Sequence, residues 1–165
     1  MAITIDATVA GEDTNSYVTA AVANAYYANT LREPTWDGYS DDDRARALIQ
    51  ATQQIEGLRL IGTVSDTLQA LHFPRTIDLD EDGAGYIIPD AIEDATCEQA
   101  LWLLKQQENP ELLDRRELQQ QGVQSISADG LTESYGGSRM PGFGAEATHL
   151  LQRYLFRTIT VSPRD

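Results

Sequence analysis

The sequence predicts a mainly α-helical protein: a helical bundle with an inserted β-hairpin, an extended N-terminal arm and a C-terminal tail. Two long stretches repeat apolar residues at helical spacing, the period changes to two after Gly122, and the first fifteen residues show no helical period. These observations divide the chain into an arm (1–15), a bundle (16–121), a hairpin (122–136), a loop with the last bundle helix (137–156) and a tail (157–165).

The first expected helix begins behind Thr19, because a threonine there can accept a hydrogen bond from the first helical turn. Pro34 ends this helix, and the segment 34–39 is expected to be a loop whose aromatic rings fold back on the core. The residues expected to face the core are Val22, Ala25, Tyr26 and Tyr27.

The second expected helix begins behind Ser40. Asp41, Asp42 and Asp43 follow, and carboxylates in a first turn face the positive end of the helix. The inward residues of this helix are expected to be Ala45, Leu48, Ile49, Thr52 and Ile55.

The longest expected helix has Pro89 in its first turn and continues through residues 90–107. Its predicted inward stripe consists of Ile92, Ala95, Thr96, Gln99, Trp102 and Leu103.

The last third of the chain begins with a short polar helix after Pro110. Residues 123–128 then alternate as a strand does, and Asp129-Gly130 favours a tight turn into a second strand, which predicts the hairpin. A final helix is expected over residues 145–156, and residues 157–161 can form a terminal strand.

Charge is the most unusual property of the composition. The chain has 26 acidic and 12 basic residues, so its formal net charge is −14. Proteins that hold nucleic acid by neutralising phosphates need clustered Lys and Arg, so this balance disfavours general DNA binding, although DNA could slide past an acidic wall without sticking.

No apolar run approaches the roughly 20 residues that cross a bilayer, and the N-terminus lacks the pattern of a secretion signal. We expect no membrane association and a cytoplasmic origin.

A calcium site is one chemical hypothesis. Asp78, Asp80 and Asp82, followed by Gly83, reproduce the opening of a calcium-binding loop, in which alternating carboxylates converge on the ion. The position of the bidentate glutamate is taken by Pro89, however, so a solvated acidic loop is favoured over a calcium site.

No pattern points to an enzyme or to a cofactor. Residues 142–147 fit a dinucleotide-binding fingerprint by letter, but the sequence after them leaves no room for the second strand that such a site needs. No Gly-x-Ser-x-Gly motif occurs, and the single cysteine, Cys97, is expected to be a buried apolar residue.

Aromatic residues raise the possibility of single-strand binding, in which bases stack on exposed rings along a basic groove. The candidate rings are Tyr26, Tyr27, Trp36, Tyr39 and Trp102. Because no cluster of basic residues accompanies them, they are expected to lie in the core or in a subunit interface.

Several short motifs together resemble a family of phage proteins known as DnaT-like single-stranded DNA-binding proteins. They are the segment Asn15–Thr19 before an alanine-rich helix, Trp36, the run Asp43–Thr52, the segment Ala70–Arg75 and the pair Ile88–Pro89. The remainder of the chain, with a polar helix, a hairpin at Gly122–Tyr135 and a helix ending at Leu155, resembles the head–tail connector proteins of tailed phages.

The resemblance to connectors implies a structural adaptor in the virion neck, made in the host cytoplasm. It would form a homo-oligomeric ring, usually of twelve subunits, between the portal protein and the tail or a head-completion (stopper) protein, and double-stranded DNA would pass through without specific binding. Apolar positions in the arm, hairpin and tail suit strand addition to neighbouring subunits. The expected interface residues are Ile3, Ile5, Val123, Ser125, Ser127, Leu131, Tyr135, Ile159 and Val161.

Two alternatives stay open beside the adaptor. One is a replication accessory protein that binds single-stranded DNA, as the family's label implies. The other is a helical domain whose acidic loop is stabilised by calcium.

Overall fold

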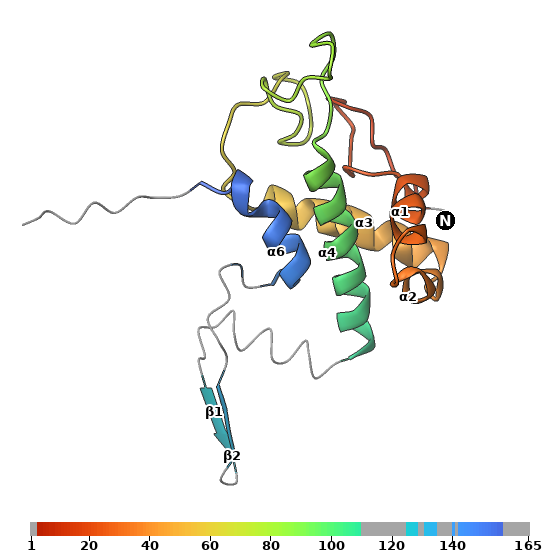
Figure 1. Ribbon diagram of the computed structural model, residues 1–165, viewed down its shortest axis with the longest axis vertical. Coiled ribbons are helices and arrows are strands. Elements are labelled where there is room, and N and C mark those ends of the chain that lie inside the picture. The colour runs from red at the N-terminus through yellow and green to blue at the C-terminus, as the bar shows by residue number, and fades with distance from the viewer. Residues whose placement is uncertain (1–2, 110–124, 129–130, 135–139, 141, 157–165) are drawn as a thin grey trace, which may run out of the picture.

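The structure is a computed structural model that describes residues 3–109, 125–128, 131–134, 140 and 142–156. Figure 1 shows how its elements are arranged. In chain order they are α1 (Ala20–Ala28), α2 (Glu33–Asp37), α3 (Asp41–Glu56), α4 (Asp90–Glu108), β1 (Ser125–Ala128), β2 (Leu131–Ser134), α6 (Ala145–Leu151) and the 3-10 helix η1 (Gln152–Tyr154).

Helix α4 is the centre of the fold. It packs against α3 and α6 and also contacts α1, and in Figure 1 α3 crosses it while α6 lies beside it. Uncharged side chains occupy most of its circumference, and a helix of this kind must be covered on most sides. Its buried residues include Ile92, Ala95, Thr96, Gln99 and Leu103, which confirms most of the predicted stripe, whereas Trp102 is only partly buried.

The first core cluster joins α1, α2, α3 and α4. Tyr27 and Trp36 are buried within it, with their rings stacked and the ring centroids 4.6 Å apart. The Tyr27 hydroxyl donates a 2.6 Å hydrogen bond to the carbonyl oxygen of Cys97, which gives the buried phenol the partner it needs. The other buried members are Val18, Ala23, Ala47, Leu48, Ala51, Cys97, Ala100, Leu101, Leu103 and Leu104.

The second core cluster joins the long segment 57–89 and α6 to helices α3 and α4. Its buried members are Tyr17, Ile55, Phe73, Ile88, Ile92, Ala95, Met140 and Leu151. Gln99 of α4 fixes the chain just before α6, because its amide nitrogen donates to the Gly142 carbonyl (3.1 Å) and its amide oxygen accepts from the Gly144 N–H (2.9 Å). These two hydrogen bonds fix the backbone at the start of α6.

Helix α1 begins as the sequence predicts, but only Tyr27 and in part Tyr26 of its four predicted inward residues face the core. Thr19 caps it by accepting a hydrogen bond from the Val22 N–H. Ala23 and Tyr27 are the buried residues, whereas Val22 is 41% exposed and Ala25 is also exposed. The helix turns Tyr27 inward because its ring stacks on Trp36 and its hydroxyl reaches the α4 backbone.

The prediction of a loop over residues 34–39 is wrong for residues 34–37, because Glu33–Asp37 form helix α2. The prediction that Pro34 ends the first helix is wrong, because α1 already ends at Ala28. Pro34 lies in the first turn of α2, where a proline loses no helical hydrogen bond. The expectation that an aromatic ring of this segment folds onto the core is confirmed for Trp36, which is fully buried.

Helix α3 begins at the predicted place. Ser40 accepts a hydrogen bond from the Asp43 N–H, and Ala45, Leu48, Thr52 and Ile55 are buried as predicted.

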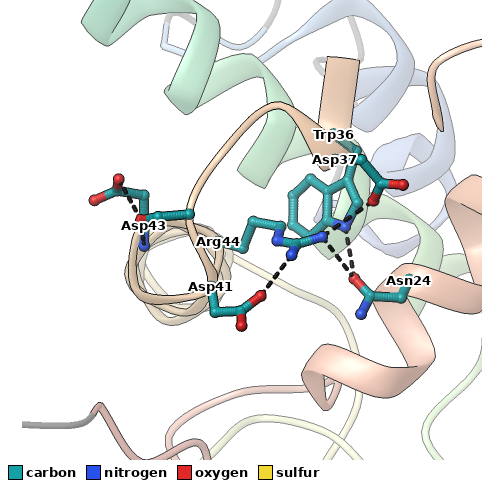
Figure 2. A network of polar contacts seen from close by, with 7 residues as sticks. Asn24, Trp36, Asp37, Asp41, Asp43 and Arg44 are labelled. Carbon is teal, nitrogen blue, oxygen red and sulfur yellow. Dashed lines mark hydrogen bonds and ion pairs between the residues drawn. The ribbon is translucent and has the colours of Figure 1, made fainter. Parts of the chain in front are cut away.

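Arg44 of α3 ties the three N-terminal helices together (Figure 2). Its guanidinium pairs with Asp37 of α2 at 3.1 Å and with Asp41 of α3, and it approaches the Asn24 side chain of α1 at 3.4 Å. The same Asn24 oxygen accepts the indole N–H of Trp36 at 2.8 Å, so the polar edge of this core ring is satisfied.

The segment before α1 is held by its own chain. Asn15 closes a loop by accepting the Asp6 N–H (2.9 Å) and donating to the Thr4 carbonyl (3.0 Å), and the Gly11 carbonyl accepts the Ala70 N–H (3.0 Å). Ile5 packs against the first core cluster. The described part of this segment contains no helix or strand, and the predicted division of the chain into segments stays a prediction.

The predicted fold class must be corrected, because the hairpin is not part of the helical bundle. The helical body, over residues 3–109 and 142–156, contains no β-strand. Strands β1 and β2 pair only with each other, antiparallel, in a two-stranded sheet with Ser125 opposite Ser134 and Ala128 opposite Leu131. The described helices pack around α4, and no strand among them offers a sheet that a hairpin could join. The prediction of a bundle with an inserted hairpin is therefore wrong.

Among the described residues, no helix is both long and apolar enough to cross a membrane.

Candidate functional site

The arginines of the described residues fall into two groups. One group forms ion pairs: Arg32 with Glu98, Arg44 with Asp37 and Asp41, and Arg46 with Asp42 and Asp43. The other group consists of Arg59, Arg75 and Arg153, which form no ion pair with any described carboxylate. Each arginine of the second group lies over an aromatic ring.

Two segments of backbone that are distant in sequence bring the neighbourhoods of Arg59 and Arg153 together. Residues 59–61 follow α3 and residues 154–156 end the described chain, and they pair antiparallel. The Phe156 N–H donates to the Arg59 carbonyl (3.0 Å) and the Ile61 N–H donates to the Tyr154 carbonyl (2.8 Å). Leu60 and Leu155 pack against the second core cluster.

Because successive side chains of an extended segment point to opposite sides, the inward positions of Leu60 and Leu155 leave Arg59 and Phe156 on the outer side.

The outer part of the site consists of two arginine–ring pairs. The Phe156 ring is exposed, whereas the Tyr154 ring is partly buried and packs against the second core cluster. The Arg59 guanidinium carbon lies 4.6 Å from the Phe156 ring centroid, and that of Arg153 lies 4.9 Å from the Tyr154 centroid. Both arginines are exposed, and the Phe156 side chain is 51% exposed. We call Arg59, Arg153, Tyr154 and Phe156 the arginine–aromatic surface.

Arg75 lies buried beside this surface, against the Phe73 and Tyr154 rings. It is only 3% exposed, and its guanidinium carbon lies 4.0 Å from the Phe73 centroid and 5.9 Å from that of Tyr154. The Phe73 and Tyr154 rings meet edge to face at 5.3 Å. Burial lowers the pKa of the Arg75 guanidinium, an effect that the nearby Asp78 carboxylate opposes.

The position of Arg75 depends on a glycine. Gly62 has a φ of +101°, and a Cβ built on it would lie 2.8 Å from the Arg75 Cδ. A larger residue at position 62 would therefore both strain the backbone and displace Arg75.

The arginine–aromatic surface offers the two kinds of contact that single-stranded nucleic acid uses. The exposed Phe156 ring can stack on a base, and guanidinium groups can pair with phosphates or lie over bases. The guanidinium groups of Arg59 and Arg153 carry charge that no described carboxylate neutralises, so this charge is available to a bound anion.

The sequence did not predict this surface. The rings proposed for base stacking include Tyr27 and Trp36, which are fully buried in the first core cluster. Phe156 was not among the proposed rings, because a phenylalanine two residues after Tyr154 in a helical pattern indicates no exposed site. The closest sequence signal is the alternation of arginine and leucine at Leu58–Leu60.

The predicted interface residues are only partly described. Ile3 and Ile5 are half-buried, and Ser125, Ser127 and Leu131 lie on strands β1 and β2. Val123, Tyr135, Ile159 and Val161 lie outside the described residues. The interface role of all nine stays a prediction.

The acidic loop binds its own backbone. Asp78 accepts the Arg75 N–H (2.9 Å), and Asp80 accepts the Ala84 N–H (2.8 Å). Within the described parts of the chain, no three His, Cys, Asp or Glu side chains, including Asp78, Asp80 and Asp82, come together as a metal site would require.

A family model described as "Putative DnaT-like ssDNA binding protein" matches residues 1–160. No curated protein and no solved structure matches the chain.

Proposed function

Because the chain belongs to this DnaT-like family, we propose that it binds single-stranded DNA and that the arginine–aromatic surface is the binding site. The observation that carries the proposal is the gathering, around Phe73, Tyr154 and Phe156, of three arginines that form no ion pair with a described carboxylate. Stacked bases and neutralised phosphates are the contacts by which single strands are held without sequence preference.

The charge of the protein limits the size of this contact. With a net charge of −14, most of the surface repels phosphate. A strand is therefore attracted near Arg59 and Arg153, the exposed arginines of the described residues that form no ion pair, and this surface can support a contact of a few nucleotides. The affinity is weak and falls steeply with salt, because phosphate neutralisation releases counterions.

Titration of a fluorescently labelled oligo(dT) with the full chain at low salt tests the proposal. Arg59→Ala, Arg153→Ala and Phe156→Ala should each weaken binding. Arg46→Ala is the matched control, because Arg46 is also an exposed arginine but pairs with Asp42 and Asp43. Absence of binding, or equal losses in the control and in the three site variants, would contradict the proposal.

A second candidate function is the head-to-tail adaptor of a tailed phage, a ring between portal and tail in the virion neck. It is favoured by a group of exposed apolar side chains on the acidic segment that precedes α4: Ile77, Leu79, Tyr86 and Ile87. Exposed apolar groups of this kind mark contact sites between proteins. Negative-stain microscopy of the protein mixed with its portal would show a stacked ring under this hypothesis, and separate particles would contradict it.

A further inference from the structure

The segment 77–87 forms a narrow antiparallel ribbon. The Asp80 N–H donates to the Gly85 carbonyl (2.9 Å) and the Ile87 N–H to the Asp78 carbonyl (3.0 Å), and Leu79 pairs with Tyr86 across the ribbon. The turn is made by Gly83, whose φ is +67°. We call residues 77–87 the acidic ribbon.

One face of the acidic ribbon is apolar and exposed. Leu79 and Tyr86 stand directly opposite each other, and Ile77 lies two residues before Leu79, so the three side chains share a face. Ile77 is 78% exposed, and the other two are more than 40% exposed. Exposure of several large apolar side chains to water is unfavourable, and a partner surface would bury them.

The tip of the ribbon is negatively charged. Glu81 and Asp82 are exposed there, and from Thr76 to Leu104 the sequence contains acidic residues but no Lys, Arg or His. The surface that fits the ribbon must therefore be apolar and positively charged.

The arginine–aromatic surface has this combination. It presents the exposed Phe156 ring together with Arg59 and Arg153, whose charges no described carboxylate neutralises. Among the other described arginines, Arg32, Arg44 and Arg46 are already paired with carboxylates of their own chain, and Arg75 is buried. Every copy of the chain thus carries both halves of a complementary contact, and within one chain both halves are exposed.

We propose that copies of this chain associate by docking the acidic ribbon of one copy on the arginine–aromatic surface of another. Because the two surfaces differ, the contact either occurs twice across a two-fold axis or repeats head to tail. The contact does not depend on DNA binding, and it is tested without DNA.

The test is the mass of the full chain over a wide range of protein concentration, by light scattering or sedimentation. The wild type should associate above the monomer mass of 18.2 kDa. Two charge-reversed variants, Glu81→Lys with Asp82→Lys on the ribbon and Arg59→Glu with Arg153→Glu on the surface, should each associate at least about tenfold more weakly, a change of 1.4 kcal/mol. Mixing the two variants restores opposite charges across the contact and should restore association.

A control separates this contact from a general effect of charge. Glu12→Lys with Asp13→Lys makes the same change in net charge as the ribbon variant, at two exposed residues far from the ribbon in sequence. A less acidic chain repels itself less, so the control should associate as well as the wild type or better, whereas the ribbon variant should associate less well.

Ile77→Ser tests the apolar part of the contact, and Leu31→Ser is its matched control because Leu31 is fully exposed on the loop between α1 and α2. Circular dichroism verifies that each variant is folded. A wild type that stays monomeric would overturn the proposal, and so would an oligomer that neither charge-reversed variant weakens.

Discussion

The guanidinium carbon of Arg59 lies 4.6 Å from the centroid of the Phe156 ring, although the two residues are 97 positions apart in the sequence. The hydrogen bond from the Phe156 N–H to the Arg59 carbonyl holds the two backbones together. Charge and stacking surface are therefore placed side by side, and substitution can separate their contributions to DNA binding.

Salt dependence distinguishes the two contributions. Loss of one phosphate contact from a single strand should reduce the slope of log K against log salt by about 0.7, so Arg59→Ala should show a shallower slope. Phe156→Ala should weaken binding by about 1–3 kcal/mol, the cost of one lost stacking contact, with the slope unchanged. Anisotropy titrations at several salt concentrations measure both quantities. Identical slopes for wild type and Arg59→Ala would show that Arg59 makes no phosphate contact.

The stacked pair Tyr27 and Trp36 should dominate the stability of the N-terminal helices. Trp36→Ala leaves a cavity in a fully buried site and should lower the free energy of unfolding by about 3–5 kcal/mol. Tyr27→Phe removes only the hydrogen bond to the Cys97 carbonyl and should cost about 1 kcal/mol. Urea unfolding measures both losses. Tyr86→Phe is the control, because a change at this exposed ring should alter the free energy of unfolding by less than about 0.5 kcal/mol. If Trp36→Ala lowered the free energy of unfolding by no more than this control, the tight packing of Trp36 would be contradicted.

Cys97 should be unreactive in the folded protein. Its side chain is buried on α4, and burial, followed by the nearby Asp94 carboxylate, raises the pKa of the thiol above its usual range. A thiol reagent at mildly alkaline pH should therefore label the native chain on the order of a thousandfold more slowly than the chain in urea, because only the opened protein reacts. Fast labelling without denaturant would show that α4 is less well covered than the structure indicates.

Glu93 should make the fold less stable at neutral pH than at mildly acidic pH. Burial, with the neighbouring Asp90 and Asp94 carboxylates, raises the pKa of Glu93 above the ordinary value of a glutamate carboxyl. Between the unfolded and the folded pKa the native state binds more protons, so the stability that this group contributes falls as the pH rises through that window.

Glu93→Gln should accordingly raise the Tm at pH 7, and the gain should shrink as the pH falls toward the ordinary glutamate range, where wild-type Glu93 is protonated as well. Thermal melts over this pH range measure the difference. Glu12→Gln, at an exposed residue, serves as the control for general loss of charge. A gain for Glu93→Gln that is independent of pH would contradict the assigned cause.

The helix starts illustrate what local chemistry makes predictable. The Thr19 and Ser40 side chains each accept a hydrogen bond from a backbone N–H three residues later, so the signal and its partner lie within one turn. The inward face of α1 was not predictable in the same way. The choice of Tyr27 over Val22 depends on Trp36 and on the Cys97 carbonyl, which belong to other helices.

The predicted place of the hairpin in the bundle failed for a related reason. Alternating residues around Asp129-Gly130 indicate a pair of strands, and β1 and β2 do pair with each other. Whether such a pair joins a larger structure depends on a sheet edge elsewhere, and the helical body has no strand to provide one.

By itself, the sequence determined the charge of −14, the starts of α1, α3 and α4, the burial of Trp36 and membership of the DnaT-like family. Only the tertiary structure decided that Arg59, Arg75 and Arg153 gather around Phe73, Tyr154 and Phe156. The physical reason is range: capping and charge act between residues that are neighbours in the chain, whereas this surface exists because packing of the second core cluster draws two remote backbone segments into one antiparallel pair.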